Sequence, residues 1–189
     1  MPARLVLASA SPRRLDLLRQ VGLEPAAVDP AELDETPAPA EAPRAYALRM
    51  AIAKFSAVAP RHPGAVVLAA DSVVAVGRRI LPKAETEAEA RACLALMSGR
   101  RHRVLGGVAA GPADAAPRTR LVETVVRFRR LDAADIDAYI ESGEWRGKAG
   151  GYAIQGRAAA FVSFLSGSYS NVVGLPLFET VRLLKAAGV

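Results

Sequence analysis

The stretch "RLVLASASPRRLDLL", residues 4–18, indicates an α/β protein. Residues 4–8 form a short apolar run typical of a buried strand, and the residues that follow have the spacing of a helix. Ser11 stands where a helix N-cap is expected, and Pro12 suits the first helical position, where no N–H is needed. A strand that leads through a turn into a helix is the opening unit of α/β folds.

Two arginines, Arg13 and Arg14, occupy the first turn of this predicted helix. The helix dipole makes that end electropositive, so each cation there costs roughly 0.3–1 kcal/mol. Either solvent screens this cost or a bound anion reverses it. The pair is therefore a solvated surface feature or the first part of an anion site.

The rest of the chain predicts a mixed sheet with helices rather than regular β-α-β repeats, within one domain, 1–189. Residues 43–58 predict a helix whose apolar face Lys54 interrupts. The stretch "AVVLAADSVVAVG" (65–77) predicts a strand over 65–70, then Asp71, then a second β-rich stretch to residue 76. The other predicted elements are a helix opened by a Thr86–Glu89 capping box and stopped at Ser98–Gly99, strands around 103–110 and 121–128, a helix from Asp132 to about 142, a glycine-rich loop over 143–156, a strand "AAFVSFL" (159–165), and a helix from Pro176 to about 187.

The composition excludes several classes of protein. A net charge of +6 invites a nucleic-acid interpretation, but the arginines are scattered and lack interleaved aromatics, so no stable nucleic-acid complex is expected. An acidic small-molecule substrate fits the charge equally well. The single cysteine, Cys93, and the two histidines exclude a disulfide framework and disfavour a Cys or His metal site. Without a signal peptide or membrane-length apolar run, we expect a cytoplasmic protein with no membrane partner.

The glycine-rich stretch "GEWRGKAGGYAIQG", residues 143–156, is not a phosphate-binding P-loop. Three residues rather than four separate Gly143 from Gly147, and Ala149 follows Lys148 where a Ser or Thr is required. Kinase-like or GTPase-like chemistry therefore loses support. No G-x-S-x-G nucleophile motif is present either.

Asp71 is the carboxylate that the pattern singles out, because it follows six apolar residues, where a buried strand is expected to end. Open α/β sheets bind ligands at such positions. Asp71 could form a turn, act as a general base, or bind a hard metal ion. By themselves, Lys54 reads as a snorkelling lysine and Lys83 as a loop charge.

Five segments in order along the chain resemble the Maf family of nucleoside triphosphate pyrophosphatases. They are "LASASPRR" (7–14), "LDETP" (33–37), "AADSVV" (69–74), "GKAGGYAIQG" (147–156) and "GSYSNVVGLPL" (167–177). The resemblance runs from about Leu5 to Leu183. It implies a mixed α/β fold related to the inosine triphosphate pyrophosphatases, with a central sheet flanked by helices and two lobes around a cleft. It also implies a homodimer and divalent-metal-dependent (Mg²⁺ or Mn²⁺) hydrolysis of a nucleotide to the monophosphate and pyrophosphate.

The resemblance carries functional roles onto matching positions of this sequence. Asp71 matches the proton acceptor and, with Glu35, would hold the metal ion. The substrate-binding positions are Ser9, Arg13, Arg14, Lys54, Ser72, Lys83 and Gln155. The chain departs from the family pattern at Gly106, where threonine is common, and at Pro82 and Ala84, which flank Lys83 where the family often has Gly and Pro.

Arg13, Ser72 and Gln155 stand at the positions that separate dTTP- and UTP-preferring members from a 7-methyl-GTP type. A glutamine amide complements the imide edge of uracil or thymine, so dTTP and UTP, or modified pyrimidine nucleotides, are the expected substrates. Arg14 is expected to grip phosphate and Arg13 to help select the base.

Two alternatives remain open: a nucleotide sensor that arrests cell division by inhibiting the septum, and a 7-methyl-GTP-type pyrophosphatase. In the enzyme interpretation, Asp71→Asn is expected to abolish turnover with thermal unfolding almost unchanged.

Overall fold

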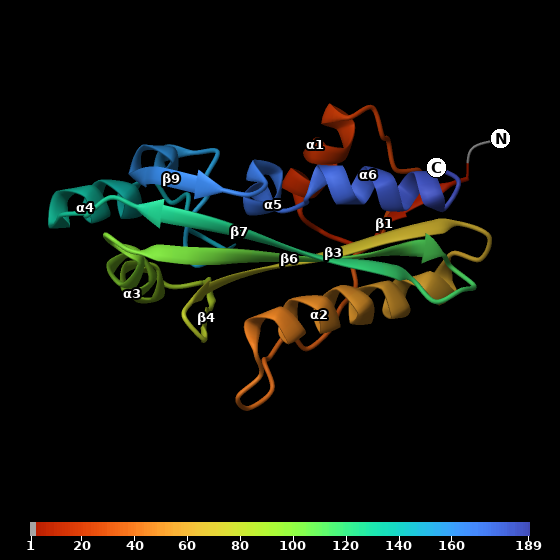
Figure 1. The fold of residues 1–189 in the computed structure, drawn as a ribbon, viewed down its shortest axis with the longest axis horizontal. Coiled ribbons are helices and arrows are strands. Elements are labelled where there is room, and N and C mark those ends of the chain that lie inside the picture. Colours follow the sequence, from red (N-terminus) through yellow and green to blue (C-terminus); the bar gives the residue numbers. More distant parts are fainter. Residues whose placement is uncertain (1–2) are drawn as a thin grey trace.

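The computed structural model describes residues 3–189 and is organised around a seven-stranded mixed sheet. The strand order is β2-β1-β3-β6-β7-β9, with β4 paired to the far part of β3 (Figure 1). A separate two-stranded sheet joins β5 and β8. The strands are β1 (Leu5–Leu7), β2 (Ala27–Val28), β3 (Val66–Val76), β4 (Arg79–Leu81), β5 (Lys83–Ala84), β6 (Arg101–Pro112), β7 (Arg118–Phe128), β8 (Lys148–Ala149) and β9 (Val162–Ser166).

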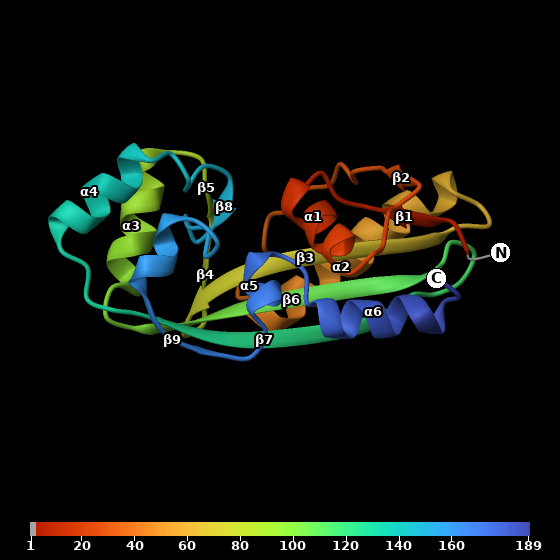
Figure 2. The ribbon, with the colours of Figure 1, turned by 90° about the horizontal axis from the view of Figure 1, so that it is seen from above.

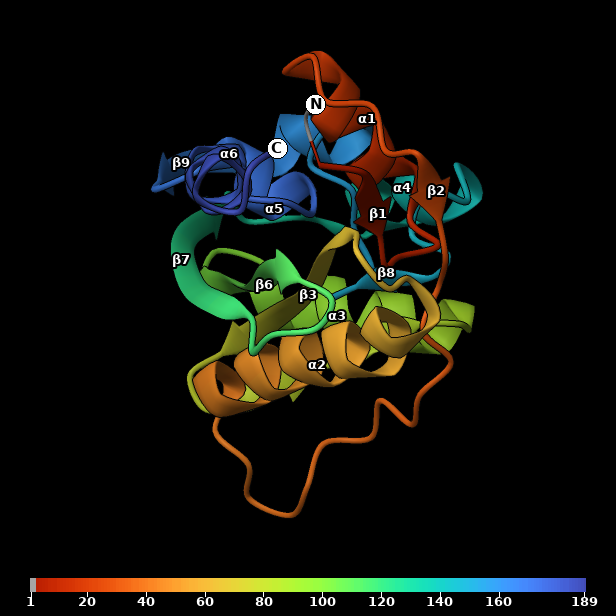
Figure 3. The same cartoon turned by 90° about the vertical axis from the view of Figure 1, so that its right-hand side faces the viewer.

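Helices cover both faces of the sheet. Helix α2 lies along one face, against β3 and β6, while α5 and α6 lie on the opposite face (Figures 1 and 3). The helices are α1 (Pro12–Gln20), α2 (Pro43–Val58), α3 (Glu87–Met97), α4 (Ala133–Glu141), α5 (Tyr169–Val173) and α6 (Leu177–Ala186), with 3₁₀ turns at Ala59–Arg61 and Arg157–Phe161. Within residues 3–189, no helix combines the length and apolar character that crossing a membrane requires. The predicted mixed α/β fold is confirmed.

The molecule has two lobes joined by long strands. Figure 2 shows α3, α4, β5 and β8 gathered at one end and α1, β1 and β2 at the other, while β3, β6 and β7 extend between them. The largest apolar cluster contains residues from both ends, among them Leu7 and Leu68 of the first lobe and Leu94 and Phe128 of the second. The lobes therefore share one core, which supports the interpretation of the chain as one domain.

Two helix starts follow their sequence signals closely. The Thr86 side chain accepts from the Glu89 N–H, while Glu89 accepts from the Thr86 N–H, so the predicted capping box begins α3. Asp132 and Asp135 form a second box at α4. Ser11 occupies the N-cap of α1, but its side chain makes no capping hydrogen bond.

The glycine pair in β6 allows close packing on both faces of the sheet. A Cβ on Gly107 would lie 2.2 Å from the backbone oxygen of Ala47, so glycine lets α2 approach the strand closely. A Cβ on Gly106 would lie 1.9 Å from Oδ1 of Asn171 on the other face. The departure at Gly106 is thus explained by the Asn171 amide, whose nitrogen donates to the oxygens of Val104 and Val122.

Several predicted boundaries are wrong. Asp71 lies in the middle of one continuous strand, β3, because β6 pairs with the whole span from Val66 to Ala75. The predicted strand over 159–165 is a 3₁₀ turn followed by β9. The glycine-rich loop contains β8, and "GSYSNVV" contains α5.

Candidate active site

The cleft between the lobes lies where one edge of β3 lacks a neighbouring strand. On that edge, β1 pairs with Val66–Leu68 and β4 pairs with Val74–Val76, and Asp71 and Ser72 lie in the gap between these two pairings. A cavity of about 440 Å³ opens there. Asp71 therefore faces the cavity from the centre of a strand. It does so because no neighbouring strand pairs with that part of β3 on this edge, and not because β3 ends there.

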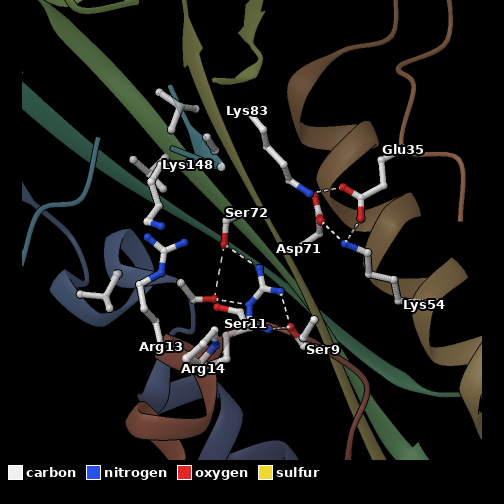
Figure 4. Close-up of a pocket in the computed structure, with 18 of the residues that line it drawn as sticks. Ser9, Ser11, Arg13, Arg14, Glu35, Lys54, Asp71, Ser72, Lys83 and Lys148 are labelled. Atoms are coloured by element: carbon white, nitrogen blue, oxygen red, sulfur yellow. Dashed lines mark hydrogen bonds and ion pairs between the residues drawn. The ribbon is translucent and has the colours of Figure 1, made fainter. Parts of the chain in front are cut away.

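A network of four charged side chains lies at one end of the cavity (Figure 4). The buried ammonium of Lys54 lies 2.6 Å from Oδ1 of Asp71 and 2.7 Å from Oε1 of Glu35. Lys83, from β5, donates to Oε2 of Glu35. Lys54 is thus part of an ion-pair network rather than a snorkelling lysine, and the two carboxylates predicted to hold a metal ion share it.

Tyr46 holds the loop that carries Glu35. Its hydroxyl donates to the backbone oxygen of Glu35 at 2.6 Å. Burial, together with the charges of Asp71 and Glu35, raises the pKa of Tyr46 to about 12, so the phenol stays protonated as a donor. Burial alone would raise the pKa of Glu35, but the hydrogen bonds from Lys54 and Lys83 outweigh it and lower that pKa. Glu35 is therefore a carboxylate at neutral pH.

A second cavity of about 350 Å³ adjoins the first across the same carboxylates. Both cavities are lined by Glu35, Asp71, Ser72 and Lys83. The second is otherwise mainly apolar, with Pro37, Tyr46, Val73, Ile80 and Leu81 in its wall. The charged network thus lies between two chambers. The first cavity, which Arg13, Arg14 and Lys148 also line, is the cationic chamber, and the second cavity is the apolar chamber.

Arg14 is locked into the protein by three hydrogen bonds. Its guanidinium donates to the Gly174 oxygen at 2.9 Å, to Ser9 Oγ at 2.9 Å and to Ser72 Oγ at 3.1 Å. Ser72 in turn donates to the Gly174 oxygen at 3.3 Å. These bonds tie the β1–α1 turn to β3 and to the end of α5. Arg14, Ser9 and Ser72 therefore line the cavity as a cross-linked wall.

Arg13 extends instead into the cavity, toward Lys148 of β8 (Figure 4). The pKa of Arg13 is lowered by burial and by the neighbouring Arg14. Burial and the charge of Arg13 likewise lower the pKa of Lys148. Burial and the neighbouring cation thus disfavour the charge of Arg13.

Gln155 is the predicted site residue that the structure does not bring to the others. It is exposed and, within the described residues 3–189, lines neither cavity. The following Gly156 packs on Glu144, whose Oε2 accepts from the Arg157 N–H at 2.8 Å, and this contact holds the turn. The same glycine-rich segment contributes Gly147, Lys148, Ala149 and Tyr152 to the cavity instead.

A magnesium or manganese ion could be held at the two carboxylates of the cleft. Glu35 and Asp71 supply hard oxygen ligands, and the described chain, residues 3–189, holds no cluster of three or more His, Cys, Asp or Glu side chains suited to a metal. Mg²⁺ is commonly held by one or two carboxylates together with substrate phosphates.

Comparison with known proteins places the chain among its relatives. A family model described as "Maf-like protein" matches residues 4–187. The chain belongs to the Maf family. This match confirms the resemblance of the five segments. Residues of these segments line the cleft, from Ser9 of "LASASPRR" to Gly174 of "GSYSNVVGLPL".

Three Maf relatives carry the name dTTP/UTP pyrophosphatase. The one from Caulobacter vibrioides is 62% identical, covering 97% of this chain and 95% of its own length. The one from Rhodospirillum rubrum is 64% identical, covering 97% of this chain and 88% of its own length. The one from Paramagnetospirillum magneticum is 63% identical, covering 98% of each. A solved structure, a nucleoside-triphosphatase described as a dITP/XTP pyrophosphatase from Mycobacterium abscessus, is 19% identical with a TM-score of 0.41, covering 68% of this chain and 76% of its own.

Lys148 lines the cleft but was not among the site residues expected from the sequence. The available signal was the Gly-Lys pair in the glycine-rich segment, which does not have the spacing of a P-loop.

Proposed function

We propose that the chain is a nucleoside triphosphate pyrophosphatase that hydrolyses dTTP and UTP to the monophosphate and pyrophosphate. The carrying observation is the buried Lys54 ammonium shared by Asp71 and Glu35 where a cationic chamber meets an apolar one. The names of relatives that are about 60% identical over nearly the whole chain support the same reaction.

The reaction is an in-line displacement at the α-phosphorus. Water attacks that phosphorus, a new P–O bond forms, and the bond to the α,β-bridging oxygen breaks. The electron pair leaves on pyrophosphate, while the proton of the water passes to Asp71. Lys54 occupies Oδ1 of Asp71, so we assign Oδ2 to the water.

Lys54 holds the carboxylate of Asp71 in one orientation. Its ammonium lies between two carboxylates and holds both in place without contacting solvent freely, since its side chain is only 8% exposed. Lys83 is half-exposed at the cleft and adds positive charge beside the substrate phosphates.

A divalent metal ion bound by Glu35, Asp71 and the substrate phosphates would neutralise phosphate charge and lower the barrier to attack. Of the two carboxylates, Glu35 is the better placed to ligate, because its side chain is 29% exposed whereas that of Asp71 is 4% exposed.

The apolar chamber lined by Tyr46, Ile80 and Leu81 suits the sugar and base. Ser72 borders both chambers, which supports its proposed role in substrate choice. The role proposed for Gln155 requires the 153–157 turn to move toward the cleft when substrate binds.

The test is pyrophosphate release from a panel of nucleoside triphosphates with Mg²⁺ or Mn²⁺, then with the metal chelated. We expect dTTP and UTP to be the best substrates and chelation to stop the reaction. Preference for a methylated guanine nucleotide, or tight binding without pyrophosphate release, would contradict the proposal.

We further propose that the enzyme acts in the cytoplasm as a homodimer. Sedimentation equilibrium over a range of concentrations tests the dimer, for which a mass of two chains is expected and a mass of one chain would count against it. Cell fractionation tests the location.

A further inference from the structure

Two cations from opposite lobes face each other across the cleft without a carboxylate between them. Arg13 comes from the first turn of α1, and Lys148 comes from β8. Figure 4 shows their charged groups pointing toward one another, and both line the cationic chamber. Throughout residues 3–189, neither side chain forms an ion pair with Asp or Glu. The groups acting on the Lys148 charge reduce to burial and Arg13 itself.

Each cation is held by a built part of the fold. The β5–β8 sheet pairs Lys83 with Ala149, and the Gly147 and Gly150 N–H groups donate to the oxygens of Ala84 and Pro82, each at 2.9 Å. Both glycines have positive φ, +63° for Gly147 and +67° for Gly150, which sets the turns on either side of Lys148.

On the opposite lobe, the three hydrogen bonds of Arg14 anchor the first turn of α1 and so fix the position of its neighbour, Arg13. The fold therefore fixes the backbone positions from which Arg13 and Lys148 extend into the cleft.

The other cations of the cleft have partners that hold their charged groups. Arg14 donates to Gly174, Ser9 and Ser72, and Lys54 is shared by two carboxylates. Lys83 is paired with Glu35. Among the described residues, Lys148 donates only to the backbone oxygen of Arg146, at 3.1 Å, so its ammonium keeps donors for a ligand. A departing pyrophosphate carries more negative charge than the nucleoside monophosphate. It needs donors that are free, and a neutral base carbonyl would not offset the repulsion between two cations.

We infer that Arg13 and Lys148 together form the subsite for the pyrophosphate group, the β- and γ-phosphates of the substrate. This inference rests on the proposed function and extends it. It reverses the roles expected for the two arginines: Arg13 binds phosphate, and Arg14 positions the wall of the cleft. It also adds Lys148, which completes the subsite from the second lobe.

The test is calorimetric titration of the metal-supplied enzyme with inorganic pyrophosphate and, separately, with thymidine 5′-monophosphate. Lys148→Met removes the charge at similar length, and Lys148→Arg restores it. Lys185→Met, which changes an exposed lysine of α6, is the matched control. We expect Lys148→Met to weaken pyrophosphate binding by about tenfold to a hundredfold, as for the loss of one charge-assisted hydrogen bond. Lys148→Arg should recover most of it, with monophosphate affinity within about twofold throughout.

Three results would overturn the inference: unchanged pyrophosphate affinity in Lys148→Met, loss of monophosphate affinity instead, or no pyrophosphate binding by the unaltered protein. Loss of monophosphate affinity would show that Arg13 and Lys148 bind the nucleoside monophosphate instead. Turnover of dTTP is measured in parallel. Pyrophosphate binding through Lys148 without turnover would refute the proposed function alone, and turnover with Lys148-independent binding would refute this inference alone.

Discussion

Replacing Asp71 by asparagine separates the chemistry of the site from its stability. Asp71 is 3% exposed, and its Oδ1 accepts from Lys54 at 2.6 Å. Leaving a buried charge wholly unpaired costs about 3–5 kcal/mol. Asparagine keeps an acceptor oxygen, and Glu35 still balances Lys54 at 2.7 Å. The cost should therefore resemble one hydrogen bond to a charged group, about 2 kcal/mol.

In a protein of this size that loss lowers the melting temperature by about 4–8 °C. The structure thus revises the expectation from sequence that unfolding would hardly change. Removal of a general base should lower kcat by roughly 10²–10⁴-fold. Thermal unfolding by circular dichroism and pyrophosphate release from dTTP measure the two effects on the same sample.

Lys54→Met is the matched comparison, because it leaves the buried Asp71 without its ammonium while Glu35 retains Lys83. We expect this variant to lose more stability than Asp71→Asn, about 3–5 kcal/mol. Turnover of Asp71→Asn within threefold of the unaltered enzyme would refute the base assignment. A Lys54→Met variant no less stable than Asp71→Asn would refute the ion-pair reasoning.

Three further predictions concern pH and packing. Because the pKa of Glu35 is lowered, its ion pairs stabilise the fold fully above about pH 4.5, the ordinary value, and less as pH falls through the folded pKa. The difference in unfolding free energy between the unaltered protein and Glu35→Gln should therefore shrink in acid. A difference that grows in acid would contradict this. Burial lowers the pKa of His102 from 6.5 to about 4, so protonation favours the unfolded chain. The unfolding free energy should therefore fall by up to about 3 kcal/mol between pH 6.5 and pH 4. In urea titrations His102→Gln should lose this pH dependence, and an unchanged pH dependence would exclude His102 as its source. Gly106→Ala meets a side-chain oxygen that can move, whereas Gly107→Ala meets helix backbone; the first should cost about 1–3 kcal/mol and the second more, and the opposite order in urea unfolding would disprove the packing argument.

The sequence predicted those elements whose signals are local. The helix Pro43–Val58 has the predicted bounds, and the predicted Thr86–Glu89 capping box forms, because an N-cap and its third helical residue satisfy each other within one turn. Asp132 begins a helix as predicted, and the structure adds a capping box with Asp135. Strands β2, β5 and β8 are two residues long and show no measurable alternation. Their existence depends on partners distant in the chain, so no window of sequence reveals them.

The site was also predicted only in part. Asp71, Glu35 and Lys54 were candidate site residues from the sequence, and the structure joins them in one ion-pair network. The sequence assigned phosphate binding to Arg14 and could not show that this side chain is held in the wall of the cleft, because its acceptor is the oxygen of Gly174, 160 residues later.

Within the glycine-rich segment, the residue that faces the cleft is decided by pairing with β5. Lys148 is therefore presented to the cavity, while Gln155 lies outside it.

The most direct test of the account is the position of bond cleavage in dTTP. Hydrolysis in ¹⁸O-labelled water, followed by mass spectrometry of the products, identifies the phosphorus that water attacks. Attack at the α-phosphorus beside Asp71 predicts one ¹⁸O atom in thymidine monophosphate and none in pyrophosphate. Label in the pyrophosphate, or release of orthophosphate and thymidine diphosphate, would contradict the proposed attack at the α-phosphorus.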